Sequence, residues 1–172
     1  MDSANTFLGS EEQRLAIEEK ARAFGFSGAA FMPASGLKII PEFRMFCEEN
    51  TCGNYNKLPA CPPMSGTVEE MTKCIADYQY AFVLQTALET DDLDSKEVQK
   101  QCKYDHNIMT DQLLDELKDS LPETRLLMSC GPWKNHSCLS AYCVSAQHMA
   151  ESVGMECWVN DNILRFFSVV LF

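Results

Sequence analysis

Six of the nine cysteines in the sequence have the residue type and the spacing that bind a metal. They form two groups with the spacings C-x4-C-x8-C-P-P and C-x7-C-x4-C: Cys47, Cys52 and Cys61, then Cys130, Cys138 and Cys143. Loop positions suit metal ligands, because soft thiolates must converge on one point from different directions of the chain. We therefore predict these six cysteines as the candidate metal ligands.

The proline that follows Cys61 bears on which metal is bound. A proline directly after a cysteine removes a backbone N–H and fixes φ, and a Cys-Pro step also closes the ligand run of bacterial ferredoxins. The pattern therefore favours an iron–sulfur cluster, 4Fe-4S above all, held by the first group and completed by one cysteine of the second. Zinc is the alternative, although structural zinc sites pair their ligands two to four residues apart. Structural or redox-active thiols are the third alternative.

The other three cysteines fit the hydrophobic core. Cys74 follows Met71 by three residues and Cys102 follows Val98 by four, so both lie on apolar helix faces, and Cys157 falls in an expected strand. Free cysteine is among the most buried residue types and packs as a small hydrophobe. We expect these three to be structural.

Residues 46–88 carry a resemblance to a known family. FCEENTCGNY begins at Phe46, Cys61-Pro62-Pro63 follows, and a capped helix from Thr67 leads into a strand. These features resemble an uncharacterised family of cysteine-rich predicted metal-binding proteins. A weaker similarity runs over residues 131–154, where Trp133 occupies a position at which the family has cysteine, and Cys130 is the candidate replacement. The resemblance implies metal binding and, by analogy, iron–sulfur chemistry, and it implies no substrate.

Charge and hydropathy exclude several classes of function. The 172 residues carry 14 Lys and Arg against 25 Asp and Glu, a net charge of −11, and contain no basic run. Because phosphate backbones and anionic membranes attract basic surfaces, we expect neither nucleic acid nor membrane binding. Residues 1–26 lack the apolar core of a signal peptide and no run of 18 apolar residues occurs, so a cytoplasmic location is expected. In that reducing compartment, clustered cysteines are metal ligands or catalytic thiols more often than disulfides.

Two functions from different classes follow from these residues. The first is a protein that holds an iron–sulfur cluster for electron transfer or redox chemistry, with a redox partner protein or a small-molecule substrate. An open iron, left by only three ligands, would make that protein an enzyme, and the sequence leaves this question open. The alternative is a zinc- or thiol-stabilised binding module without catalytic activity, in which the metal pins the loop. His136, two residues before Cys138, is a further candidate to ligate or hydrogen-bond a cluster thiolate.

The elements that must position these residues are those of an α/β or α+β domain. We expect a single domain over residues 1–172, with a sheet of about five strands, covering helices, a Cys/Pro-rich metal-binding loop at 46–66 and a second cysteine-containing segment at 130–157. Strands are expected over residues 29–32, 37–40, 80–88, 125–129, 155–159 and 166–172, and helices over 10–24, 41–46, 67–78, 94–120 with a break near Asn107, and 139–153. Ser10 is the expected cap of the first helix, and Thr67 with Glu70, and Asp94 with Glu97, are expected capping boxes.

Overall fold

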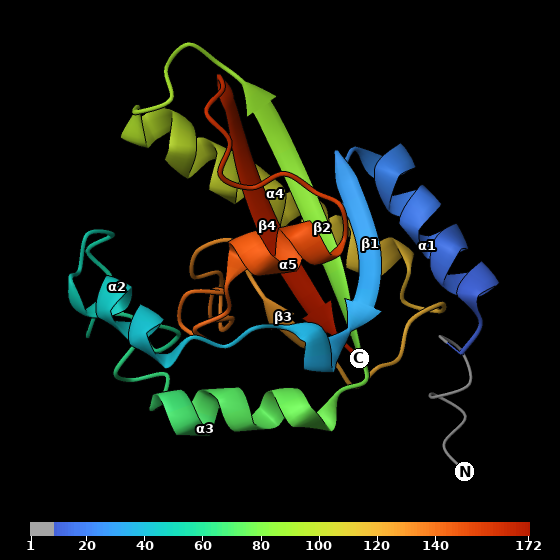
Figure 1. The fold of residues 1–172 in the computed structure, drawn as a ribbon, viewed down its shortest axis with the longest axis horizontal. Helices are drawn as coiled ribbons and strands as arrows, with labels where there is room; N and C mark the ends of the chain where they lie inside the picture. The colour runs from blue at the N-terminus through green and yellow to red at the C-terminus, as the bar shows by residue number, and fades with distance from the viewer. Residues whose placement is uncertain (1–8) are drawn as a thin grey trace.

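Four antiparallel strands form one sheet in the order β1-β2-β4-β3. The computed structural model describes residues 9–172. The strands are β1 (Gly28–Pro33), β2 (Tyr80–Glu89), β3 (Leu126–Met128) and β4 (Ile163–Leu171). The two longest, β2 and β4, lie at the centre and pair from Ala81 opposite Leu171 to Glu89 opposite Ile163. Helices cover the sheet, as Figure 1 shows, so the expected class is confirmed as α+β.

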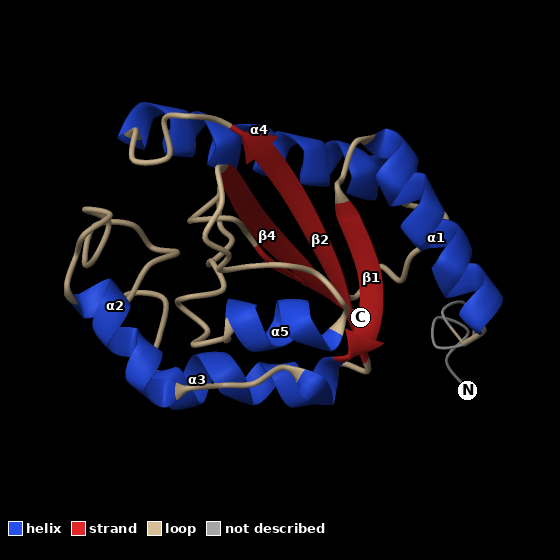
Figure 2. Cartoon of the chain, turned by 45° about the horizontal axis from the view of Figure 1, so that its top comes forward, coloured by secondary structure: helices blue, strands red, loops and turns tan. Residues whose placement is uncertain are grey.

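The central strands are apolar on both faces because both faces are covered. In β2, Phe82 and Leu84 point into one core while Ala81 and Val83 point into the other. Successive side chains of a strand alternate between faces, so a continuous apolar run supplies two cores at once. The sheet is therefore the middle layer of three, as Figure 2 shows.

Helices α1 (Glu11–Phe24) and α4 (Lys96–Glu116) cover one face. The Ser10 hydroxyl caps α1 by accepting from the Gln13 amide at 3.1 Å, as expected. Ser95, and not Asp94, caps α4, and its hydroxyl accepts from the Val98 amide at 3.3 Å. Both caps pair amides that the first helical turn leaves without a partner.

The other face is covered by α3 (Val68–Lys73), the 3₁₀ turn η3 (Cys74–Asp77) and α5 (Ala146–Ser152). Two further 3₁₀ turns, η1 (Ala34–Gly36) and η2 (Pro41–Phe43), lead from β1 into the short helix α2 (Arg44–Glu48). The capping box of Thr67 and Glu70 at the start of α3 is confirmed. In Figure 1, α2 lies at the left, away from the sheet.

The sheet has four strands, so the expectation of about five is slightly wrong. Residues 37–40 contribute only one isolated bridge, between Ile39 and Val144, because Pro41 has no N–H to continue a ladder. Residues 155–159 form no strand, and Trp158 there is 82% exposed. The segment packs against the sheet through side chains, since Met155 lies beside Gly28 of β1 and Gln85 of β2 donates to the Glu156 carbonyl.

Two helices also differ from the expectation. The break near Asn107 is absent, because the buried polar side chains of His106 and Asn107 find partners on the sheet side while the α4 backbone continues. The last helix begins at Ala146 and not at Leu139, because residues before Ser145 form turns that place Cys143 at a φ of 57°.

No helix among residues 9–172 is both long and apolar enough to cross a membrane. We expect no signal peptide in residues 1–26. Residues 1–8 of that segment lie outside the described residues.

Candidate metal centre

The first three candidate ligands sit on α2 and on a loop that its own backbone hydrogen bonds hold in place. The Asn56 amide donates to the Pro62 carbonyl at 2.9 Å, and the Cys61 amide donates to the Leu58 carbonyl at 2.9 Å. Cys47 lies within α2 and is half-buried, Cys52 is exposed in the loop, and Cys61 is buried. The proline-rich sequence therefore gives a succession of turns, not a helix or strand, and presents three thiols from one segment.

Cys138 approaches this loop from the other half of the chain. It pairs with Ser129 in an isolated parallel bridge, and the Ser129 amide donates to the Ser137 carbonyl at 3.0 Å. The turn that follows directs the Ala141 and Ser140 amides at the Cys138 sulfur, which lowers the pKa of this thiol, although burial raises it by more. Backbone N–H groups directed at a sulfur stabilise a thiolate once a metal replaces its proton.

The thiols of the loop and Cys138 lie within electrostatic reach of one another. Burial raises the pKa of Cys47 to about 11; Cys138, Cys52 and Cys143 add to the rise, and Arg44 opposes it. Burial also raises the pKa of Cys61 to about 11, again with contributions from Cys138 and Cys52. We call this set the four-thiol group: Cys47, Cys52, Cys61 and Cys138. Chain segments from two halves of the sequence therefore meet at four sulfurs.

Cys130 and Cys143 stand at the edges of this group. Burial raises the pKa of Cys130 to about 12, and the other cysteines that affect it are Cys138 and Cys102. The Cys143 thiol is buried beside Arg44, and its Sγ lies 3.8 Å from the Pro41 carbonyl oxygen. Neither thiol contributes to the pKa of Cys61. Of the second predicted group, Cys138 thus acts on both Cys47 and Cys61, and Cys143 acts on Cys47 but not on Cys61.

The sulfurs of the four-thiol group are near each other but do not surround a single point. Within residues 9–172, no three His, Cys, Asp or Glu side chains are arranged to hold a metal ion. A tetrahedral zinc site with Zn–S bonds of about 2.3 Å draws its sulfurs to within about 4 Å of one another. A cluster binds each cysteine through a different iron and holds the sulfurs farther apart.

The three cysteines expected in the core divide between two environments. Cys74 packs against the core and donates from Sγ to the Met71 carbonyl at 3.0 Å, and Cys157 also packs against it from a loop. Cys102 is partly exposed and lies in neither core cluster among the described residues, so its predicted burial is wrong. It lines a small pocket with Thr86 of β2 and Phe166 of β4, so it lies on the sheet side of α4 without being fully buried.

The charged groups that act on His136 are Asp111 and Lys134, and burial lowers its pKa. Its backbone forms a tight pair with Trp133, whose indole Nε1 donates to Asp111 at 2.9 Å. Trp133 therefore has a hydrogen-bond partner of its own in Asp111.

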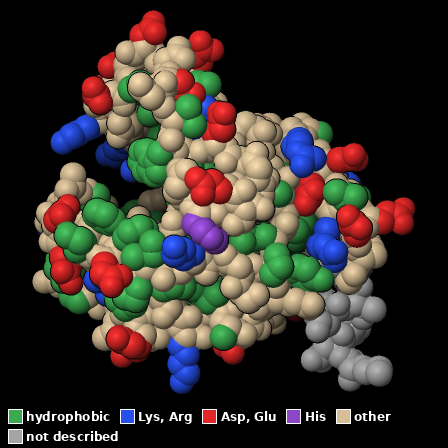
Figure 3. Space-filling model, viewed as in Figure 1, with side chains coloured by type: hydrophobic (Ala, Val, Ile, Leu, Met, Phe, Trp, Pro, Cys, Tyr) green, Lys and Arg blue, Asp and Glu red, His purple; other side chains and the backbone are tan. Residues whose placement is uncertain are grey.

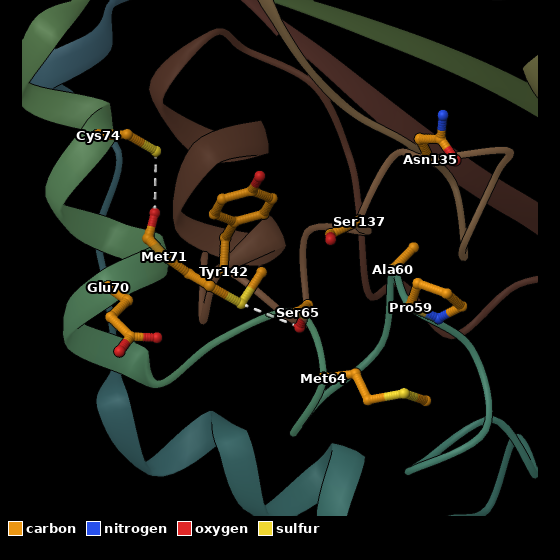
Figure 4. A pocket seen from close by; sticks show the side chains of 10 residues that line it. All are labelled: Pro59, Ala60, Met64, Ser65, Glu70, Met71, Cys74, Asn135, Ser137 and Tyr142. Atoms are coloured by element: carbon orange, nitrogen blue, oxygen red, sulfur yellow. Dashed lines mark hydrogen bonds between the residues drawn. The ribbon is translucent and has the colours of Figure 1, made fainter.

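A cavity of about 380 Å³ opens between the loop, α3 and the 135–142 segment, and its wall includes Cys74 (Figure 4). Its wall includes Ala60 and Ser137, the residues directly before Cys61 and Cys138. Its polar side chains come from the loop, α3 and the 135–142 segment, as Figure 4 shows: Ser65, Glu70, Asn135, Ser137 and Tyr142. A small molecule in this cavity would contact the chain immediately beside the four-thiol group.

Exposed hydrophobic side chains surround the same region. Met45 and Phe46 on α2 and Leu58 and Met64 on the loop are all at least 39% exposed. In the space-filling view of Figure 3, hydrophobic side chains gather on the side of the molecule where α2 lies. We call these four residues the apolar rim. Single exposed apolar residues are ordinary, but four on one segment form a patch.

One charged residue at the site carries no signal in the sequence that would have identified it. Arg44, three residues before Cys47, directs its guanidinium into the protein, where it donates to the carbonyls of Gly66 at 2.9 Å and Ala141 at 3.1 Å. These contacts join α2 to the start of α3 and to the turn after Cys138. They depend on tertiary structure, so sequence spacing could not predict them.

Comparison with known proteins gives one match. The model of a family described as "Predicted metal-binding protein (DUF2284)" matches residues 30–133, which include the three thiols of the loop and end before Cys138. No curated protein and no solved structure gives a significant match to the chain.

Proposed function

Because the chain belongs to the DUF2284 family of predicted metal-binding proteins, we propose that it holds an iron–sulfur cluster, 4Fe-4S in type, on the four-thiol group. The cluster would serve electron transfer or redox chemistry. The observation that supports this assignment is that Cys138, from the second half of the chain, and Cys52 both raise the pKa of Cys47 and of Cys61. Four cysteine thiolates are the ordinary ligand set of such a cluster.

Two features of the site suit a cluster. The four candidate donors are all sulfur, the ordinary ligand set of an iron–sulfur cluster. The backbone amides of Ser140 and Ala141 point at the Cys138 sulfur, and such hydrogen bonds are among the features that set cluster potentials. When bound, the cluster supplies one-electron chemistry.

The surroundings of the site support a protein redox partner. The apolar rim lies on the same α2 and loop segment that carries Cys47, Cys52 and Cys61. Electron-transfer encounters use small interfaces, and an apolar patch beside the redox centre provides one. The acidic net charge of the chain would favour a partner with a basic docking face.

The cavity beside Cys61 and Cys138 favours a second candidate, an enzyme whose cluster acts on a small molecule. Its volume of about 380 Å³ falls within the range of small-ligand pockets. Its lining contains a carboxylate, an amide and hydroxyls but no Lys or Arg, so it suits a neutral or cationic polar molecule better than an anion.

Cysteine variants purified anaerobically test the ligand assignment. Cys61→Ser and Cys138→Ser should each lose most of the iron and acid-labile sulfide, because each removes a thiolate ligand. Cys74→Ser and Cys102→Ser, which alter cysteines outside the four-thiol group, should retain both. Equal loss in all four variants would contradict the assignment, and colourless protein with stoichiometric zinc would favour the zinc-stabilised binding module.

A further inference from the structure

The cavity between the loop, α3 and the 135–142 segment contains a hydroxyl donor that the protein leaves without a partner. Tyr142 and Ser137 line its wall and are only 8% and 7% exposed. Burial raises the pKa of Tyr142 to about 12, and a hydrogen bond with Ser137 opposes the rise, so the two hydroxyls lie close together. A bond between two hydroxyls uses only one of their two O–H donors.

The second donor of this hydroxyl pair is open to the cavity. No other hydrogen bond of the described residues engages the side chain of Tyr142 or Ser137. Neither hydroxyl is an enclosed atom without a partner, because among residues 9–172 only Arg44 Nε is in that state. A bound molecule that carries an acceptor oxygen would therefore satisfy a donor that has no acceptor in the protein.

Glu70, on the α3 side of the same cavity, adds a carboxylate that is already held in place (Figure 4). Its Oε2 accepts from the Thr67 amide at 3.0 Å as one half of the capping box. Its Oε1 accepts no hydrogen bond from the described residues. A group that is ordered before a ligand binds loses little freedom on binding. The cavity thus presents a fixed negative charge with one acceptor oxygen to spare.

Negative charge prevails around the cavity wall. No Lys or Arg lines it. The guanidinium of Arg44 reaches the wall residue Met71 from outside the lining, where Nη2 donates to the Met71 sulfur at 3.3 Å. On the other side, Asp77 adds to the effect of burial in raising the pKa of Cys74, a further wall residue. The cavity therefore attracts a cation more than an anion.

We propose that this cavity binds a small organic ammonium ion that also carries an uncharged hydroxyl, an amino alcohol in chemical class. The ammonium group pairs with Glu70, and the hydroxyl oxygen accepts from the pair formed by Tyr142 and Ser137. A volume of about 380 Å³ has room for such a molecule, and Met64 supplies apolar surface for its methylene groups. The inference names the class of molecule for the second candidate function, on which any reaction rests, but the binding itself requires no metal.

The test titrates the purified protein with amino alcohols from ethanolamine to 6-amino-1-hexanol and measures each Kd by ligand-observed NMR. The tightest binder is then compared with the diol and the hydroxy acid of the same length, which replace only the ammonium group. The amino alcohol should bind about threefold tighter than the diol, the usual gain from a partly exposed ion pair. It should bind at least about tenfold tighter than the hydroxy acid, whose carboxylate would be repelled by Glu70.

Two substitutions separate the contributions of charge and hydroxyl. Glu70→Gln should abolish the preference for the amino alcohol over the diol while α3 stays capped, because glutamine also completes a capping box. Glu69→Gln is its matched control and should keep the preference, since Glu69 is exposed on α3 outside the cavity. Tyr142→Phe should weaken both ligands by about three- to tenfold, the contribution of one hydrogen bond. Tyr104→Phe, on the exposed side of α4, should change neither Kd.

Three results would overturn the proposal: no saturable binding of any amino alcohol, tighter binding of the hydroxy acid, or a preference for the amino alcohol that survives Glu70→Gln. Circular dichroism checks the fold of each variant, and Glu70→Gln decides if Tyr142→Phe does not fold. Iron and acid-labile sulfide are measured on the same samples. Protein that contains both but binds no amino alcohol refutes the cavity's role alone, and protein that contains neither but binds the amino alcohol refutes the cluster alone.

Discussion

Stability should fall on acidification because a histidine is buried in its neutral form in the core. His106 on α4 is 1% exposed. Its Nδ1 lies 2.7 Å from the Thr86 hydroxyl and its Nε2 lies 2.8 Å from the Ser168 hydroxyl, while Phe26 meets the ring edge-on at 5.6 Å between centroids. Burial lowers the pKa of His106 from 6.5 to about 4.

The size of this effect follows from linkage. The unfolded chain takes up a proton near pH 6.5 and the folded chain only near pH 4, so the unfolded state binds more protons between these values. Stability is therefore complete above pH 6.5 and is lost as the pH falls toward 4. With about 1.36 kcal/mol for each pKa unit, the loss reaches about 2 kcal/mol at pH 5 and about 3 kcal/mol at pH 4.

Urea unfolding between pH 7 and pH 5, followed by far-UV circular dichroism, measures this loss. His106→Gln keeps hydrogen-bonding groups but does not titrate, so its free energy of unfolding should fall by about 2 kcal/mol less than that of the parent over this range. His148→Gln is the matched control, because His148 is exposed on α5. Equal pH dependence in the parent and His106→Gln would refute the explanation. The cysteines are common to all three proteins, so their effects cancel in the comparison.

Three further substitutions test other parts of the fold by urea denaturation. Asn107→Leu should cost about 2–5 kcal/mol, because the Asn107 side chain pairs both the amide and the carbonyl of Cys130 in the core and its loss leaves two buried groups unpaired; a cost below 1 kcal/mol would contradict this. Phe82→Ala should cost about 3–5 kcal/mol, because Phe82 is fully buried and stacks on Phe31 at 4.3 Å. A smaller cost would mean that the core between the sheet and helices α1 and α4 collapses into the cavity left by the missing ring. Thr67→Ala should cost about 1 kcal/mol through loss of the α3 cap, with the metal content unchanged; loss of metal would show that α3 also shapes the site.

The sequence predicted elements best where a local signal agrees with burial. The runs at residues 80–88 and 166–172 became β2 and β4, because apolar stretches of that length bury well between two layers of helices. Hydroxyl side chains at Ser10 and Thr67 marked helix starts correctly. Strand order and direction depend on tertiary pairing, and no local pattern contains them.

The wrong predictions of secondary structure arose where tertiary contacts overrode a local sequence pattern. The polar pair at His106 and Asn107 suggested a helix break, but Thr86, Ser168 and the Cys130 backbone satisfy these side chains. Residues 155–159 have the composition of a strand, but they contact the sheet through side chains and not through a backbone ladder. In both segments, tertiary contacts decided the structure against the local propensity.

The sequence likewise predicted some residues of the candidate site and missed others. The spacing of the first group and the Cys-Pro-Pro step identified the loop, because loop ligands are close in sequence. The choice among Cys130, Cys138 and Cys143 could not be made, since all three lie outside regular helix or at its edge and only the fold shows which one meets the loop. Arg44 was missed because a lone arginine on a short helix has no distinguishing pattern.

The central claim is that the four-thiol group holds an iron–sulfur cluster, and chemical analysis of the anaerobically purified protein tests it most directly. Iron and acid-labile sulfide should be present together in near-equal amounts, about four of each per chain for the 4Fe-4S type. Protein that contains neither iron nor sulfide, or that contains one zinc ion per chain in their place, would contradict the claim.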